Sequence, residues 1–230
     1  MTSKTSSKHS YKFLKNMKKP LLIAIDGPSA SGKGSLAKKL ASHFSIPHLN
    51  TGALYRAVAL RLILSKIPLE KFEENINFLT QNLANDDLEN DAVFNEETGE
   101  IASIIAKNPF LRQKLVKIQH NFIENSILSQ NGAVLDGRDI ASKIMPQASY
   151  KFFITANVFE RAKRRFKQLT DKGNKVSYDK ILAQLKTRDE NDKNRTNSPL
   201  VIDKDAIIID NGNLTPNETF TYALAVIKQK

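Results

Sequence analysis

The chain between residues 27 and 35 combines small side chains with a single lysine. The residues in order are Gly27, Pro28, Ser29, Ala30, Ser31, Gly32, Lys33, Gly34 and Ser35. Small residues allow successive backbone N–H groups to turn inward and bind phosphate oxygens, and the lysine adds a mobile ammonium for the outer phosphates. The pattern G-x-x-x-x-G-K therefore predicts a binding loop for the phosphates of a nucleoside triphosphate such as ATP.

The sequence on both sides of this loop supplies the two elements that the motif requires. Residues 21–26 form an apolar run that is too short for a helix and ends at Gly27-Pro28, which indicates a buried strand. Apolar residues then recur at helical spacing between 36 and 44, so the positive end of a helix faces the loop. A glycine- and serine-rich turn that only caps a helix is the alternative, and the order strand, loop, helix disfavours it.

The two residues after the lysine narrow the class of protein. Most phosphate-binding loops have a hydroxyl residue directly after the lysine as a Mg²⁺ ligand, whereas this chain has Gly34 and then Ser35. The resulting G-K-G-S form resembles the nucleoside monophosphate kinases. A GTPase is excluded separately, because the chain lacks the [NT]-K-x-D guanine motif and a D-x-x-G switch after the loop.

Three further segments carry the polar residues that a second nucleotide would need. They read Leu-Asn-Thr-Gly-Ala-Leu-Tyr-Arg at 49–56, Asp-Gly-Arg-Asp-Ile at 136–140, and Arg-Asp-Glu-Asn-Asp-Lys-Asn-Arg at 188–195, with Ser-Pro-Leu at 198–200 and Asp-Ala at 205–206 beyond them. In order and spacing these segments resemble the bacterial cytidylate kinases, from about residue 19 to the end of the chain. The resemblance implies a cytoplasmic enzyme of pyrimidine nucleotide metabolism that uses ATP and Mg²⁺ to phosphorylate CMP or dCMP.

The same resemblance assigns residues to the acceptor, the donor and the metal. The acceptor CMP would contact Thr51, Tyr55, Arg56, Ser103, Arg112, Arg138, Asp139, Arg188, Asp192 and Arg195. The groups that act on the transferred phosphoryl would be Lys33, Arg138, Arg188 and Arg195. Arg161 and Arg165 match lid arginines on the ATP side of related kinases, and Ser35 and Asp136 would hold Mg²⁺ through its bound water.

Base recognition has a chemical argument of its own. The resemblance places Ser103, Arg112 and Asp139 on the cytosine ring. Cytosine offers an exocyclic amino donor where uracil offers a carbonyl, so a carboxylate such as Asp139 can discriminate between the two bases. With uracil bound, a buried acceptor would be left unpaired, which penalises the wrong base.

The helix expected over 178–192 offers a second independent argument. At about 100° per residue, Arg188, Asp192 and Arg195 fall within about 60° of one another, at the edge of the apolar stripe of this helix. The alternative is an exposed i,i+4 ion pair between Arg188 and Asp192. For the two lid arginines, the alternative is a solvated basic helix face.

The implied reaction is in-line attack of a CMP phosphate oxygen on the γ-phosphorus of ATP. No general base is needed, because a phosphate monoester has a second pKa near ~6 and is largely dianionic at neutral pH. Two polyanions repel each other, so catalysis must depend on cations and positioning. Residues 161–195 hold twelve Lys/Arg against five Asp/Glu, and we expect this basic segment to close over the phosphates and exclude water.

The remaining pattern supplies the elements that position these residues. Short continuous apolar strands are expected at 21–26, 133–135, 150–155 and 206–210. Helices are expected at 53–65, 69–83, 109–128, 158–169, 178–192 and 217–228, with a loop-like acidic insertion over 85–100. Such strands alternating with helices predict an α/β protein. We expect a three-layer P-loop NTPase fold with a central parallel sheet of about five strands, a helical lid and an insertion that binds the nucleoside monophosphate (NMP).

These elements form a single kinase domain at 19–230. Its core would comprise 19–50, 108–156 and 196–230, the NMP-binding insertion about 51–107, and the lid about 157–195. Members of the family usually carry a longer insertion with a small antiparallel sheet. Residues 85–101 are shorter than that insertion, so we expect a more open base site.

Most of the positive charge lies in two segments. The net charge is +11 over 230 residues, and residues 1–19 carry six lysines and no acidic residue. The rest of the excess lies mainly in 161–195, so the charge is local and is not a general coat for polyanions. Residues 1–18 predict a disordered basic tail, rich in Ser, Thr and Lys, and Met17 is an alternative start.

Composition excludes several function classes. Without cysteine the chain can form no disulfide and no site built on sulfur. Its apolar runs are too short to cross a bilayer, and no segment has the features of a secretion signal. We expect a cytoplasmic monomer that binds ATP and CMP or dCMP but neither nucleic acid nor membranes. His43, His48 and His120 have no partner pattern, so we expect structural roles for them.

Two alternatives remain open from the sequence. The first keeps the fold and changes the acceptor to UMP or a similar small compound. The second is a non-catalytic nucleotide-binding protein that switches a partner or binds RNA through the basic tail. That protein would bind nucleic acid with a steep salt dependence, which would vanish without residues 1–16.

Overall fold

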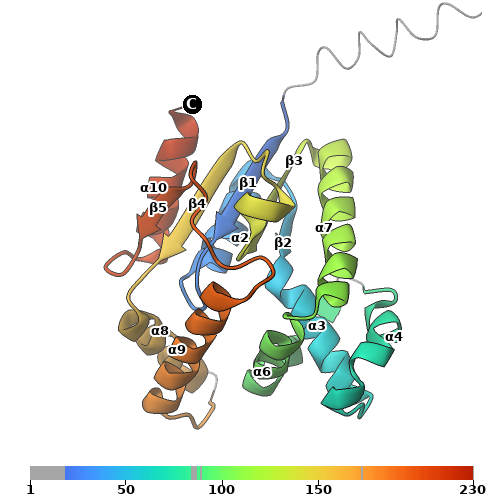
Figure 1. Ribbon diagram of the computed structural model, residues 1–230. Coiled ribbons are helices and arrows are strands. Elements are labelled where there is room, and N and C mark those ends of the chain that lie inside the picture. The colour runs from blue at the N-terminus through green and yellow to red at the C-terminus, as the bar shows by residue number, and fades with distance from the viewer. Residues whose placement is uncertain (1–18, 84–86, 89, 172, 230) are drawn as a thin grey trace, which may run out of the picture.

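A parallel sheet forms the centre of the molecule (Figure 1). The computed structural model describes residues 19–83, 87–88, 90–171 and 173–229. Within them the strands run in the order β2-β3-β1-β4-β5, and every neighbouring pair is parallel. Their bounds are β1 Leu21–Asp26, β2 His48–Asn50, β3 Gly132–Gly137, β4 Tyr150–Thr155 and β5 Ile207–Asp210. The α/β class and the parallel sheet of five strands are as predicted, although β2 is too short for the apolar pattern to reveal.

Helices cover both faces of the sheet, because the central strand β1 is apolar on both sides. Side chains alternate along a strand, so Leu22 and Ala24 pack with α3 and α7 on one face. Ile23 and Ile25 pack with α2 and α10 on the other face. The helices are α2 Lys33–Phe44, α3 Thr51–Leu64, α4 Ile76–Thr80, α6 Glu96–Ile105, α7 Pro109–Gln130, α8 Val158–Asp171, α9 Tyr178–Asn194 and α10 Pro216–Lys228. The result is the expected three-layer architecture.

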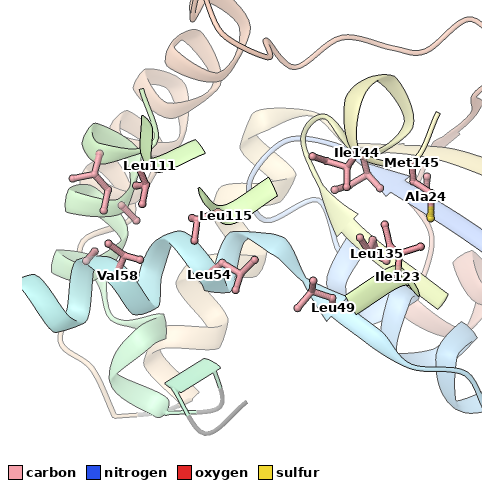
Figure 2. Packing of buried hydrophobic residues seen from close by; sticks show 14 of the residues in the cluster. Ala24, Leu49, Leu54, Val58, Leu111, Leu115, Ile123, Leu135, Ile144 and Met145 are labelled. Carbon is pink, nitrogen blue, oxygen red and sulfur yellow. The ribbon is translucent and has the colours of Figure 1, made fainter. Parts of the chain in front are cut away.

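On the face of the sheet that α3 and α7 cover, side chains of these helices and of the strands pack into one hydrophobic core (Figure 2). Leu54 from α3, Leu115 from α7 and Leu135 from β3 are each buried in it. The long helix α7 begins where the sequence predicts, because the side chain of Asn108 accepts a hydrogen bond from the N–H of Leu111. This packing fixes the position of β3, whose end carries several of the expected site residues.

Strand register brings the expected site segments to one edge of the sheet. Asp26 at the end of β1 lies opposite Gly137 of β3, and Asn50 of β2 lies opposite Asp136. Parallel strands present their carboxyl ends at the same edge, where ligands bind in open α/β sheets. The phosphate loop, the start of α3 and the segment after β3 therefore converge.

The helix expected over 69–83 is wrong as a single element. The structure has two short 3₁₀ turns, η1 Leu69–Lys71 and η2 Glu73–Asn75, followed by α4. Asn75 breaks the pattern, because its side-chain amide donates to the carbonyl of Lys71 at 2.8 Å and replaces a helical N–H there. The chain leaves the helical conformation again after Thr80.

The expectation of a loop-like insertion over 85–100 is also wrong where the structure describes it. A 3₁₀ turn, η3 Asp91–Phe94, leads into α6, which starts at Glu96. Thr98, Ala102 and Ile105 are buried on one face of α6, and this helix lies along α3. The helical spacing of these residues is the signal that the acidic composition of the segment obscures.

Helices α8 and α9 form a pair beyond the carboxyl edge of the sheet (Figure 1). Ala162 and Leu169 of α8 pack with Ile181 and Leu185 of α9. A π-helical turn, η4 Ile140–Ile144, follows β3. No helix in the described ranges is both long and apolar enough to span a membrane. The predicted tail at 1–18 lies outside the described residues.

Candidate nucleotide site

The loop after β1 depends on glycine for its shape. Gly32 has a left-handed backbone with φ of 87°, which residues with a side chain rarely adopt. At Gly27 a Cβ atom would lie 2.1 Å from the carbonyl oxygen of Ile154 on β4. The loop therefore turns tightly against the sheet and leads directly into α2 at Lys33.

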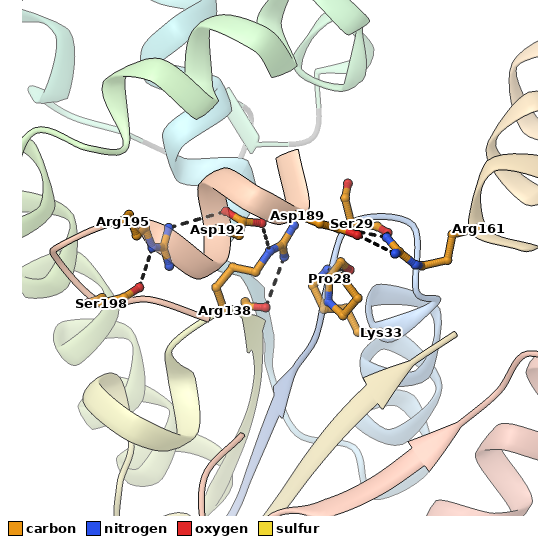
Figure 3. Close-up of polar contacts among 10 residues, drawn as sticks. Pro28, Ser29, Lys33, Arg138, Arg161, Asp189, Asp192, Arg195 and Ser198 are labelled. Carbon is orange, nitrogen blue, oxygen red and sulfur yellow. Dashed lines mark hydrogen bonds and ion pairs between the residues drawn. The ribbon is translucent and has the colours of Figure 1, made fainter. Parts of the chain in front are cut away.

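Side chains from distant segments hold the outer side of this loop (Figure 3). Arg161 of α8 donates to the carbonyl of Ser29 at 3.0 Å and pairs with Asp189 of α9 at 2.5 Å. Asn211, just after β5, donates to the carbonyl of Ser31 at 2.8 Å. Arg161 is buried behind the loop and does not line the cavity in front of it. Its position supports the loop and does not match the direct ATP contact that the sequence predicts.

A cavity of about 1200 Å³, here called the larger cavity, opens in front of the loop. Residues 29–35 line it together with Asp136 and Arg138 from the end of β3, and α8 and α9 form much of the remaining wall. Gly27 and Pro28 are buried and do not line this cavity. Its size and position suit a nucleoside triphosphate whose phosphates lie on the loop.

Lys33 lies in the larger cavity, and no carboxylate in the described part of the chain forms an ion pair with it. Its Nζ donates to the carbonyl of Pro28 at 3.1 Å. Burial and, to a smaller extent, the nearby Arg138 lower the pKa of Lys33 to about 7, although Asp136 opposes this shift. A partly buried ammonium in such surroundings is stabilised by an incoming anion.

A second cavity, of about 70 Å³ and here called the smaller cavity, adjoins the larger one. Ser103, Arg138 and Arg188 line both. Nine of the ten residues expected to contact the acceptor line the smaller cavity. They are Thr51, Tyr55, Ser103, Arg112, Arg138, Asp139, Arg188, Asp192 and Arg195. The tenth, Arg56, lines the larger cavity.

Ion pairs connect the walls of the smaller cavity. Arg112 of α7 pairs with Asp139 and lies over the ring of Tyr55, 5.6 Å from its centroid. Arg138 donates from Nε to Asp192 of α9 at 2.6 Å (Figure 3). Burial opposes the charged form of Asp192, yet Arg138 holds the pKa of this carboxyl below its usual value. The smaller cavity therefore has its charges placed before a ligand binds.

One donor atom of Arg195 has no hydrogen-bond partner in the described residues. Its Nε donates to the carbonyl of Ser198 at 2.5 Å, and its Nη1 lies 3.7 Å from Asp192. Its Nη2 is buried and has no hydrogen-bond partner in the described residues. An unsatisfied buried donor costs about 1–3 kcal/mol, so this atom marks a place for an acceptor oxygen of a ligand.

Arg188 and Arg56 are less neutralised by the protein. The i,i+4 ion pair of Arg188 with Asp192 does not form, and Arg188 makes no other ion pair in the part of the chain that the structure describes. Burial lowers its pKa to about 10, and burial lowers that of Arg56 to about 9. Arg56 donates to the backbone carbonyl of Val93 at 2.9 Å.

The expected metal-holding residues face the larger cavity. Asp136 reaches toward the loop, with Oδ2 3.8 Å from the place that a Cβ on Gly34 would take, and Ser35 lines the same cavity. These are hard oxygen donors, which suit Mg²⁺. The described residues contain no group of three or more His, Cys, Asp and Glu that could bind a metal by itself. The donor set therefore fits an ion that arrives with its own phosphate and water ligands.

Several site residues escape the sequence analysis. Arg164 lines the larger cavity and donates to the side-chain oxygen of Asn211 at 3.0 Å. Glu96 lines it as well and pairs with the expected donor-side residue Arg165 at 2.5 Å. His48 has a partner after all, since its Nε2 lies 2.7 Å from Oδ1 of Asp136. A signal existed for Asn211 alone, because it directly follows a buried strand at the edge where ligands bind.

Comparisons with known proteins agree with this geometry. The model of the family described as cytidylate kinase matches residues 23–229. A protein of Bartonella tribocorum named cytidylate kinase is 42% identical over 215 residues, with 91% of this chain and 95% of that protein covered. One of Azorhizobium caulinodans with the same name is 41% identical over 210 residues, covering 91% of this chain and 98% of the other. A solved structure of an uncharacterized protein from Eubacterium ventriosum shares the fold, with a TM-score of 0.52 at 20% identity, over 92% of this chain and 100% of that chain.

Proposed function

The chain belongs to the cytidylate kinase family, and we propose that it transfers the γ-phosphoryl group of ATP to CMP or dCMP. The products would be ADP with CDP or dCDP. The observation that carries this proposal is the pair of adjoining cavities, because Arg138 and Arg188 line both. Phosphates bound in the two cavities would meet at these two guanidinium groups.

The donor would bind in the larger cavity with its phosphates on residues 29–35. The N-terminus of α2 and the Lys33 ammonium would carry positive charge to the outer phosphates. Arg161, held between the loop and Asp189, would keep the loop rigid, and Arg164 and Arg165 would lie on the donor side of the cavity. Helices α8 and α9, within the proposed lid at about 157–195, would cover the phosphates and exclude water.

The acceptor would bind in the smaller cavity. Asp139, already paired with Arg112, would accept a hydrogen bond from the cytosine amino group with its other oxygen. Arg195 would donate from its unsatisfied Nη2 to the acceptor, and Arg138 would hold the CMP phosphate. The small volume implies that the walls must separate to admit a nucleotide, so α6 and α9 would move on binding.

The chemical step needs charge neutralisation more than proton transfer. An oxygen of the CMP phosphate forms a bond to the γ-phosphorus as the bond to the bridging oxygen of ADP breaks. The attacking monoester is already a dianion near neutral pH, so no base is required. Lys33, Arg138 and Arg188 would stabilise the charge that develops between the two nucleotides. Bound Mg²⁺ would neutralise charge on the β- and γ-phosphates, with Asp136 and Ser35 orienting its waters.

The proposal extends to the metal, the oligomeric state and the location of the protein. Mg²⁺ would be the metal, the protein would act as a monomer, and its place would be the cytoplasm, where both nucleotides are found. Omitting Mg²⁺ from the assay and determining the molar mass of the purified protein by light scattering test the first two.

A nucleotide panel tests the proposed function. The purified chain is supplied with ATP and Mg²⁺ and with CMP, dCMP, UMP, AMP or shikimate in turn, and each product is identified by chromatography. We expect rapid formation of CDP and dCDP and much slower reaction of the other acceptors. A preference for UMP would instead support the kinase of another acceptor. Binding of ATP without any CDP, together with salt-sensitive RNA binding, would support the non-catalytic alternative.

A further inference from the structure

His48 is the first residue of the edge strand β2, and its side chain lies next to a carboxylate of the proposed site. It belongs to β2, which pairs with β3, and Asp136 stands near the end of β3. Nε2 of His48 is 2.7 Å from Oδ1 of Asp136, and the two side chains are 13% and 3% exposed. The hydroxyl of Thr51 donates to the backbone carbonyl of Asp136 at 2.9 Å. Both the backbone and one side-chain oxygen of Asp136 are therefore fixed by neighbours.

The other carboxylate oxygen of Asp136 faces the phosphate loop. Its Oδ2 lies 3.8 Å from the place that a Cβ on Gly34 would occupy, and Asp136 lines the larger cavity. Asp136 also raises the pKa of Lys33, so the two charges sense each other. Even so, the pair does not come within ion-pair distance in the described structure. One oxygen of Asp136 is thus engaged by His48, and the other faces the phosphate loop.

This arrangement has a clear physical consequence. A carboxylate free to rotate beside a partly buried ammonium would close onto it, because opposite charges attract more strongly near a protein surface than in bulk water. Such a pair would neutralise Lys33 and remove Asp136 from the phosphates at the same time. Hydrogen bonds from histidine to a carboxylate near a metal fix its orientation, and loss of partners of this kind usually costs 10–100-fold in metal affinity or activity.

We propose that His48 is a positioning residue for phosphoryl transfer, which holds Asp136 toward the phosphate loop and keeps it from pairing with Lys33. The inference rests on the proposed function. His48 touches neither nucleotide and acts through Asp136. The substitution that tests it is His48→Phe, which keeps an aromatic ring and removes the hydrogen bond. His48→Gln is the rescue variant, because its amide can still donate to Oδ1.

The expected result is a fall in kcat of about 10–100-fold in His48→Phe, with the KM for CMP little changed. His48→Gln should regain most of the lost rate. The affinity of Mn²⁺ for the protein in complex with a non-hydrolysable ATP analogue, measured by electron paramagnetic resonance, should fall in His48→Phe as well. His120→Phe is the matched control, because His120 is exposed on α7, and it should change neither quantity.

A double-mutant cycle decides whether His48 acts through Asp136. In an Asp136→Asn background, His48→Phe should cost almost nothing further. Equal kcat and Mn²⁺ affinity in His48→Phe and the parent would overturn the inference, and so would losses that multiply in the double variant. If His48→Phe folds poorly, the cycle is run with His48→Gln, where a loss as large as that in Asp136→Asn would also contradict it. Because the parent is assayed for CDP in parallel, failure of the proposed function would be seen separately.

Discussion

The two cavities hold their positive charge in different ways. In the smaller one, Arg112 and Arg138 already pair with the carboxylates of Asp139 and Asp192. In the larger one, Lys33 donates only to a backbone carbonyl within the described residues, and burial lowers its pKa to about 7. A paired cation stays in place with or without a ligand, whereas a partly buried cation without a carboxylate gains most when an anion arrives. This contrast is what we expect if the smaller cavity binds the base of the acceptor and the larger cavity binds phosphates, as proposed above.

Replacing the cation of the larger cavity should have the largest effect. In Lys33→Met the side chain still fills its space but cannot neutralise phosphate, so we expect kcat to fall by about 10³-fold or more. The free energy of unfolding should stay the same or rise, because a partly buried charge that has no carboxylate partner in the described residues is removed. Steady-state kinetics and denaturant unfolding measure the two effects. Lys38→Met, exposed on the same helix, should change neither, and a Lys33→Met protein that loses stability with activity would contradict this contrast.

The substitution Asp139→Asn tests the role of the paired charges in the smaller cavity most specifically. The amide can still accept from Arg112, so the buried arginine keeps a partner, but it can also donate to the O4 carbonyl of uracil. We expect the ratio of kcat/KM for CMP over UMP to fall by about 10–100-fold. Competition assays with both acceptors measure the ratio. An unchanged ratio would show that another residue reads the base.

The lowered pKa of Lys33 should make ATP binding depend on pH. At pH 8 the free protein holds Lys33 largely neutral, since its pKa is about 7, and bound phosphates favour the ammonium. ATP binding should therefore take up a proton at pH 8, and its affinity should fall by up to about tenfold per pH unit above 7. Calorimetry in two buffers of different ionisation enthalpy measures the uptake, which should vanish in Lys33→Met. ATP binding without proton uptake in the parent would contradict the lowered pKa.

The lowered pKa of Lys33 also affects the free energy of unfolding. The sign of this effect follows from the number of protons that Lys33 binds in the folded and in the unfolded chain. Between pH 7 and the ordinary pKa of 10.5 the unfolded chain binds more protons at Lys33 than the folded chain. The contribution of Lys33 to the free energy of unfolding should therefore rise with pH across this window. Denaturant unfolding of the parent and of Lys33→Met at pH 7 and pH 9 measures the difference, and a flat difference would contradict it.

The smallest expected effect concerns Arg165, a cation of the larger cavity that is already paired with a carboxylate. Arg165 of α8 pairs with Glu96 of α6 at 2.5 Å, and both residues line the cavity. ATP phosphates would have to compete with this carboxylate, so Glu96→Gln should lower the KM for ATP by a few fold, as suits a partly exposed pair. Glu97→Gln, exposed on the same helix, is the control. A raised KM for ATP in Glu96→Gln would mean that the pair instead helps to hold the bound state.

Local sequence patterns predict the sheet and the phosphate loop, because a short apolar run and a glycine-rich turn each adopt mainly one structure. The nine residues around the smaller cavity that we propose for the acceptor come from motifs whose order matches a known family. The pairs His48–Asp136 and Arg165–Glu96 could not be predicted in this way, since their partners are 88 and 69 residues apart. Both depend on how β2 and α6 pack, and these are the elements that composition and length conceal. For a related reason the contact of Arg161 with the carbonyl of Ser29 could not be predicted, because a basic helix pattern does not tell which arginine faces a ligand.

The most direct test of the central claim follows the γ-phosphoryl group itself. ATP labelled at the γ-phosphate is mixed with excess enzyme, CMP and Mg²⁺, and the label is traced after a single turnover in the parent and in Lys33→Met. We predict that the label passes to CDP in the parent, with little inorganic phosphate, and stays on ATP in Lys33→Met although CMP still binds. Label released as inorganic phosphate by the parent, or passed to CDP at the parental rate by Lys33→Met, would contradict the account.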